Sequence, residues 1–129
     1  MAVVEKDYRL RNVLSLRKKM TSKDVALEII KLRKFLKDNG IKKTGSITTV
    51  TFSIEMQNGV PFIDMEILVP LPNRVIVSGE YVFKPIFHMV NAVCISKSEH
   101  ETSRIRNLLC WNIYDKLIRN KQQQDFLPA

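Results

Sequence analysis

The residues best suited to chemistry are two histidines and two cysteines, and their spacing favours neither catalysis nor metal binding. His88 and His100 are twelve residues apart, so they do not form the i, i+4 pair with which a helix holds a metal ion, and no third ligand accompanies them. Cys94 and Cys110 lie in apolar segments without a CxxC pair, which predicts buried, reduced thiols. The G-x-S-x-G, Walker and G-x-G-x-x-G motifs are absent from the sequence. We therefore expect a protein with no enzymatic activity, no cofactor and no metal ion.

The charge of the chain indicates binding. Lysine and arginine number 21 against 13 aspartates and glutamates, which gives a formal net charge of +8. Thirteen basic and five acidic residues fall within positions 1–45, so this third of the chain carries the whole excess. Such an excess favours an acidic partner, either a protein or a nucleic acid.

Length and composition predict one domain over residues 1–129, with 45% hydrophobic and 26% charged residues. The longest uncharged apolar run, Ile86 to Ile95, is far shorter than the roughly 20 residues that span a bilayer. Glu5 and Asp7 stand where a signal peptide would need an apolar core. We expect a cytoplasmic protein that does not enter a membrane.

Periodicity predicts a strand, a helix and a hairpin in the first half of the chain. Tyr8 to Leu16 alternates as a strand does, with Leu10, Asn12, Leu14 and Leu16 on one face. Thr21 or Ser22 can cap a helix that stops at Asn39-Gly40, and its apolar stripe consists of Val25, Ile29, Leu32 and Leu36. Ile47–Met56 and Pro61–Val69 flank the turn residues Gln57-Asn58-Gly59 and are typical of an antiparallel hairpin.

The second half predicts strands followed by another helix. Arg74 to Ser78 has the pattern of a short edge strand, and Glu80 to Ile95 that of a long one. Ser96-x-x-Glu99 and Ser98-x-x-Glu101 are overlapping capping boxes for a second helix. The apolar residues of that helix would be Ile105, Leu108, Leu109, Trp111, Ile113, Leu117 and Ile118.

The two strand-to-helix units resemble each other at an offset of 79 residues, which aligns Asn12 with Asn91, Leu14 with Val93 and Leu16 with Ile95. Chance alternation of apolar residues is the alternative explanation for these matches. We predict an α+β fold made of a duplicated βαββ unit, an antiparallel sheet with two helices on one face and its other face open.

The predicted first helix carries the candidate partner-binding residues. Its face opposite Val25 holds Lys23, Lys31, Arg33, Lys34 and Lys37, which is the pattern of a solvated face or of a phosphate-binding one. Leu27 and Ile30 fall among these lysines, and an apolar pair in a basic face suits an acidic protein. We take Leu27, Ile30, Lys31 and Lys34 as the candidate contacts.

The segment Phe62-Ile63-Asp64-Met65-Glu66-Ile67-Leu68-Val69-Pro70-Leu71 is similar to the closing strand of the first repeat in GyrI-like domains. Tyr81 to Pro85, Asn91 to Ser96 and the helix with Trp111 resemble the start of the second repeat. These are effector-binding domains of multidrug-sensing regulators and of the gyrase-inhibitory protein. The chain resembles small stand-alone GyrI-like proteins of Gram-positive bacteria, some of them encoded beside type VII secreted toxins.

The resemblance implies binding of cationic or amphipathic small molecules at a carboxylate on the open sheet face. The pleat places Phe62, Asp64, Glu66 and Leu68 on one face, and Ile63, Met65, Ile67 and Val69 under the helices. Glu66 is the candidate contact for an organic cation, with Asp64 beside it and the Phe62 ring adding a cation–π contact. The alternative is that both carboxylates merely lie on the solvated side of the strand. A protein adaptor or chaperone for an acidic partner such as a secreted toxin is the second functional hypothesis, and nucleic-acid binding is the third.

The chain departs from the GyrI-like pattern at its end. Gln122 to Ala129 are too few residues for the hairpin that should follow the second helix, so the second repeat is expected to be incomplete. An open sheet edge of this kind accepts a partner strand, and we list a dimer formed through that edge among the expected assemblies.

Overall fold

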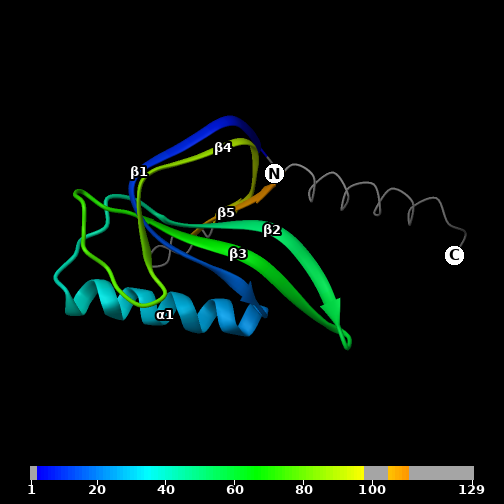
Figure 1. Cartoon of the computed structure of the whole chain (residues 1–129). Helices are drawn as coiled ribbons and strands as arrows, with labels where there is room; N and C mark the ends of the chain where they lie inside the picture. Colours follow the sequence, from blue (N-terminus) through cyan, green and yellow to red (C-terminus); the bar gives the residue numbers. More distant parts are fainter. Residues whose placement is uncertain (1–2, 98–104, 111–129) are drawn as a thin grey trace, which may run out of the picture.

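The computed structural model describes residues 3–97 and 105–110 of the chain. Five strands and one helix make up this part, and the architecture is α+β (Figure 1). The elements in chain order are β1 (Val3–Met20), α1 (Ser22–Asp38), β2 (Ile47–Gln57), β3 (Val60–Pro70), β4 (Val82–Lys97) and β5 (Ile105–Cys110). None of the described segments is a helix long and apolar enough to cross a membrane.

The five strands form one sheet that closes into a barrel in the order β1-β3-β2-β5-β4. The pair β2/β5 is parallel, and all other pairs are antiparallel. The prediction of an antiparallel sheet is therefore wrong for this pair, because β5 pairs with β2 in parallel while it closes the barrel. β1 is long enough to serve both β3 and β4, because its residues 3–15 pair with β4 and its residues 13–20 with β3. β1 continues past Ser15, where its pairing with β4 ends, and β2 continues past Thr51, where its pairing with β5 ends.

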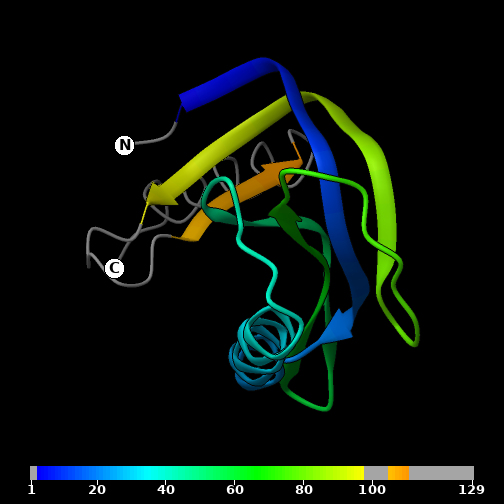
Figure 2. The same ribbon diagram turned by 90° about the vertical axis from the view of Figure 1, so that its left-hand side faces the viewer.

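Helix α1 lies against the outside of the barrel, under β1 and β3 (Figure 2). Two apolar cores result, one on each side of the sheet. The core between α1 and the sheet contains Leu14, Leu16, Met20, Ile29, Leu32, Leu36, Ile47, Met65, Ile67, Val69 and Leu71. The core inside the barrel contains Tyr8, Val13, Val50, Leu68, Phe87, Ala92 and Leu108.

A change of alternation in β1 lets one strand serve both cores. Asn12 has a φ of 51°, and asparagine tolerates this left-handed conformation better than most residues. Leu10 before it packs in the barrel core, whereas Leu14 after it packs under α1. The prediction that Leu10 and Leu14 share one face is therefore wrong. Extended backbone alternates strictly, and a single residue at positive φ interrupts that alternation.

The helix and hairpin predictions are confirmed. The Thr21 hydroxyl accepts the Asp24 N–H at 3.3 Å and the Asp24 carboxylate accepts the Thr21 N–H at 3.3 Å, so a capping box begins α1. Asn58 and Gly59 have φ values of 52° and 79°, which suits a two-residue turn between paired β2 and β3. The predicted pleat of β3 is also observed, since Met65 and Ile67 lie under α1 and Leu68 lies in the barrel.

Three further structural predictions are wrong. Arg74–Ser78 forms no strand. Ile105–Cys110 is strand β5 and not part of a helix, because its leucines complete the barrel between β2 and β4. The face of the sheet opposite α1 is not open, because the sheet closes on itself. The remainder of the predicted second helix and the expected incomplete end of the second repeat lie outside the described residues.

Candidate binding surfaces

The carboxylate of Glu66 is buried in the barrel and already hydrogen-bonded. Glu66 is 1% exposed. Its Oε2 accepts hydrogen bonds from Ser15 Oγ and from Lys84 Nζ, both at 2.5 Å. Lys84 Nζ also lies 5.7 Å from the centre of the Phe87 ring. The chain thus supplies its own ammonium group at the residue that sequence reasoning assigned to an external cation.

Asp64 lies one pleat further along the same face of β3 and is also paired. The Arg17 guanidinium donates two hydrogen bonds to its carboxylate, at 3.2 and 3.0 Å, and lies 3.9 Å from the centre of the Phe52 ring. The hydrogen bond from Arg17 holds the pKa of Asp64 below its ordinary value. Phe62, half-buried, follows on the same face. The structure therefore brings Phe62, Asp64 and Glu66 onto one face, as expected, with a cation on each carboxylate.

The outer face of α1 has a different character. Leu27 and Ile30 are 48% and 62% exposed, and Lys31 and Lys34 lie on the same stripe of the helix. Lys23 lies one turn before Leu27. Within residues 3–97 and 105–110, neither Lys23 nor Lys34 forms an ion pair. We call Lys23, Leu27, Ile30, Lys31 and Lys34 the α1 stripe; it lies opposite the buried residues Ile29, Leu32 and Leu36.

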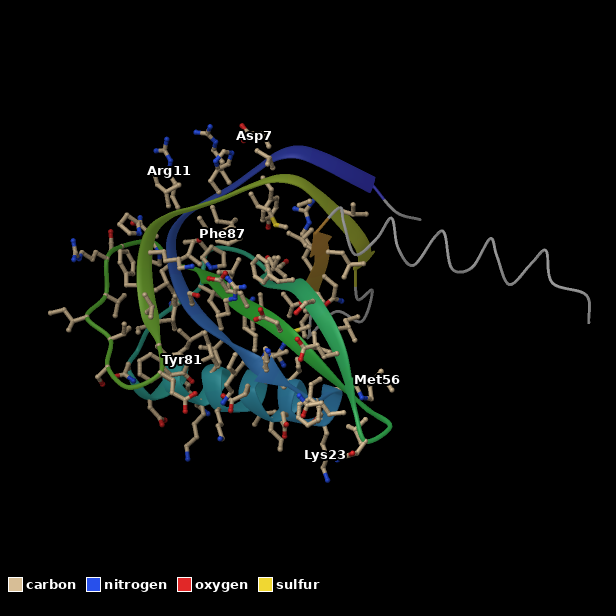
Figure 3. The ribbon with its side chains drawn as sticks, turned by 45° about the vertical axis from the view of Figure 1, so that its right-hand side comes forward. Asp7, Arg11, Lys23, Met56, Tyr81 and Phe87 are labelled. Atoms are coloured by element: carbon tan, nitrogen blue, oxygen red, sulfur yellow. The ribbon has the colours of Figure 1, made fainter. Side chains whose placement is uncertain are left out.

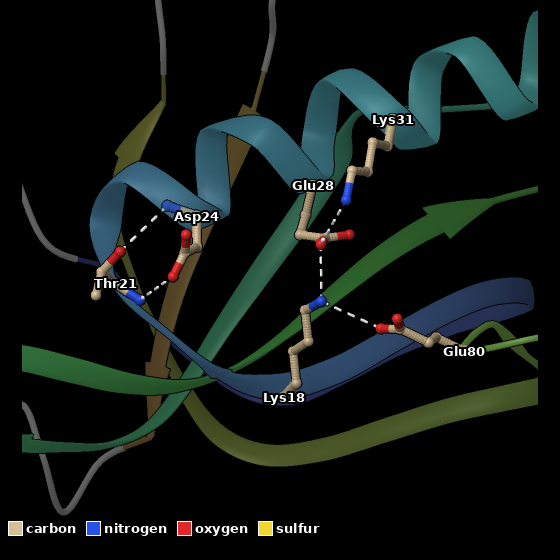
Figure 4. A network of polar contacts seen from close by, with 6 residues as sticks. All are labelled: Lys18, Thr21, Asp24, Glu28, Lys31 and Glu80. Carbon is tan, nitrogen blue, oxygen red and sulfur yellow. Dashed lines mark hydrogen bonds and ion pairs between the residues drawn. The ribbon is translucent and has the colours of Figure 1, made fainter.

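A small ionic network fixes the base of this surface. Lys18 on β1 donates to Glu28 Oε1 at 2.7 Å and to Glu80 Oε2 at 3.1 Å (Figure 4). The hydrogen bond from Lys18 lowers the pKa of Glu28, and Lys31, with its Nζ 3.6 Å from the same oxygen, acts in the same direction. The same bond to Glu28 raises the pKa of Lys18. The network holds α1 against β1 and the segment that precedes β4.

A hollow of about 320 Å³ lies between the α1 stripe and β1. Its lining consists of Lys18, Lys19, Met20, Asp24, Leu27, Glu28 and Lys31. Two of the predicted partner contacts, Leu27 and Lys31, line it, whereas the predicted ligand residues on β3 do not. Sequence reasoning found the exposed pair on α1 but missed the hollow, because only the packing of α1 against β1 brings Lys18 to Met20 beside Leu27.

Other polar clusters give little support for a site. Asp7 and His88 are hydrogen-bonded across β1 and β4, and this bond is the main reason why the pKa of Asp7 lies below its usual value. In the part of the chain that the structure covers, no group of three or more His, Cys, Asp and Glu side chains could hold a metal ion. Lys84 and Ser15, the partners of Glu66, carried no sequence signal, because strand closure alone brings them to it.

Comparison of the chain with models of protein families, with curated proteins and with solved structures finds no match, so the resemblance to GyrI-like domains stays a prediction.

Proposed function

We propose that this chain is a non-enzymatic binding domain that docks an acidic protein partner on the α1 stripe. The observation that carries the proposal is the exposure of Leu27 and Ile30, 48% and 62%, between lysines on one helical stripe. Apolar side chains at the centre of such a patch provide affinity on burial, and the surrounding lysines select a partner of opposite charge.

The distribution of charge supports a partner over a pocket ligand. Residues 1–45 carry the whole excess of +8. On β3, the buried Glu66 and the half-buried Asp64 already have cations of the chain itself. On α1, the ammonium groups are exposed and keep their hydration, so a partner's carboxylates can meet them at low desolvation cost.

The test uses a designed amphipathic helical peptide with leucines on one face and glutamates beside them, and a twin in which every glutamate is lysine. We expect the chain to bind the glutamate peptide in preference to the twin, with an affinity that falls as salt rises. The double substitution Lys31→Glu with Lys34→Glu should lower the affinity for the glutamate peptide by about tenfold or more and raise the affinity for the twin.

The matched control is Lys42→Glu with Lys43→Glu, which makes the same change in net charge on exposed residues beyond the end of α1. Equal losses in both double variants would show a response to net charge alone and would overturn the proposal. Duplex DNA is a further arm: tight, salt-sensitive binding of DNA without binding of the glutamate peptide would favour the nucleic-acid alternative instead.

A small-molecule site at Glu66 is the second candidate, favoured by one observation. The Glu66 carboxylate is 1% exposed, and its cation is the ammonium of Lys84. This ammonium lies 5.7 Å from the centre of the Phe87 ring, and the Lys84 side chain is 38% exposed. An external organic cation would have to displace Lys84. We expect Lys84→Met to create affinity for alkylammonium ions, and Glu66→Gln with Lys84→Met to abolish it, as measured by thermal unfolding with each ion.

The finer architecture and the location are proposals as well. We propose a duplicated βαββ origin and a cytoplasmic protein. The order β1-α1-β2-β3 agrees with one such unit. Secondary chemical shifts of residues 111–118 would test the second unit, which requires a helix there.

A further inference from the structure

The hollow beside α1 is a continuation of the α1 stripe. Leu27 belongs to both, and Met20, which is 1% exposed, lies in the lining. The two carboxylates of the lining are occupied: Asp24 by the Thr21 N–H and Glu28 by Lys18. Lys19 and Lys31 are more than half exposed, and their ammonium groups lie 3.5 Å from Glu55 and 3.6 Å from Glu28. The hollow thus offers Met20 and Leu27 as apolar contacts among charged residues, with exposed ammonium groups at its rim, and this lining suits an apolar side chain that is flanked by acids.

The apolar surface continues from the hollow onto the β2–β3 hairpin. Met20 pairs in register with Ile63, and Ile63 with Ile54, so three apolar side chains form one row across β1, β3 and β2. Met56, 66% exposed, follows Ile54 on the same face of β2. Figure 3 shows Met56 at the hairpin end of the barrel, which is also the end at which Lys23 lies in the first turn of α1. The apolar track therefore runs from Ile30 through Leu27 and the hollow to Met56.

We infer that the acidic partner places one large apolar side chain in the hollow, between Met20 and Leu27, and continues over the hairpin to Met56. This inference rests on the proposed function. A volume of about 320 Å³ is at the lower end of the 300–1,000 Å³ typical of ligand pockets, which suits a single anchoring side chain better than a whole small molecule. Buried anchors of this kind supply most of the affinity of an interface.

A double-mutant cycle tests the anchor. The glutamate peptide is made with phenylalanine or alanine at its central apolar position, and both forms are titrated against the wild-type chain, Leu27→Ala and the distant control Ile86→Ala. We expect the phenylalanine peptide to bind about tenfold more tightly than the alanine peptide to the wild type and to Ile86→Ala, but only about twofold more tightly to Leu27→Ala. The same affinity ratio for all three proteins would overturn the anchor.

The hairpin contact has its own control in Ile76, which is 96% exposed and lies in the segment between β3 and β4. Met56→Asp should lower the affinity for the phenylalanine peptide by about fivefold or more, because it adds like-charge repulsion and removes an apolar contact. Ile76→Asp should lower this affinity by less than about twofold. Unchanged binding by Met56→Asp would remove the hairpin from the interface.

The proposed function and the anchor in the hollow can be disproved separately. If the glutamate peptide binds, responds to Lys31→Glu with Lys34→Glu and yet shows no coupling to Leu27, the proposed function stands and the anchor falls. If neither peptide form binds the wild-type chain at low salt, the proposed function itself is contradicted.

Discussion

In the barrel interior the buried carboxylate of Glu66 accepts a hydrogen bond from Lys84, and the half-buried carboxylate of Asp64, further along β3, accepts two from Arg17. On α1, by contrast, Lys23 and Lys34 have no acidic partner among the described residues. The reason is the cost of desolvation. A charge inside the barrel is stable only when it is paired, while a lysine on the helix surface keeps its water. Charges that are already paired hold the fold together, and exposed, unpaired ones remain for a partner.

The largest difference between the two regions should appear in apolar truncation. Leu68 is fully buried in the barrel, so Leu68→Ala should cost about 2–5 kcal/mol of unfolding free energy. Ile30→Ala, on the α1 stripe, should change it by less than about 0.5 kcal/mol. Chemical denaturation measures both. Similar losses for the two variants would show that Ile30 is part of the core, and that the α1 stripe is not a free surface.

The paired charges of the barrel should come next in size. Lys84→Met leaves the Glu66 carboxylate buried without its cation, and we expect a loss of about 2–3 kcal/mol, below the usual value for a buried pair because Lys84 is partly exposed. Adding Glu66→Gln to Lys84→Met should recover much of the loss. Lys34→Met is the control on α1 and should be close to neutral. A loss that the second substitution leaves unchanged would mean that Lys84 acts through packing.

A smaller effect is expected where the two regions meet, at the pair of Lys18 and Glu28. Because the pKa of Glu28 is lowered in the folded chain, the stabilisation is complete above the ordinary value of 4.5 and is lost as pH falls through the folded value. Glu28→Gln should therefore cost about 1 kcal/mol at neutral pH, and the difference from wild type should shrink below pH 4.5. Asp38→Asn, at the exposed end of α1, is the control. A difference that persists unchanged in acid would exclude the ion pair as its cause.

Local signals in the sequence were sufficient for α1 and the hairpin. The cap at Thr21, the stop at Asn39-Gly40 and the Asn58-Gly59 turn each determine backbone within a few residues. The exposure of Leu27 and Ile30 followed from the same helical periodicity. These features need no knowledge of the rest of the fold.

The barrel and its ion pairs could not be predicted in this way. Residues Ile105 to Leu109 combine apolar and polar side chains in a pattern that also fits a helix, and pairing with β2 and β4 decides for a strand. The alternation of β1 changes at Asn12, a conformation that the residue type permits without requiring. Lys84 reaches Glu66 only after β4 has closed on β1. Strand β5, the change of alternation at Asn12 and the Lys84–Glu66 pair all depend on long-range pairing of strands, which periodicity does not encode.

The most direct test of the account is to map the amide chemical shifts of the isotope-labelled chain while the glutamate peptide is added. We predict that the largest changes fall on α1 around Leu27, Ile30, Lys31 and Lys34, with smaller ones near Met20 and Met56. Largest changes at Ser15, Glu66 and Lys84, with α1 unaffected, would contradict the assignment of the α1 stripe as the binding surface and favour the barrel instead.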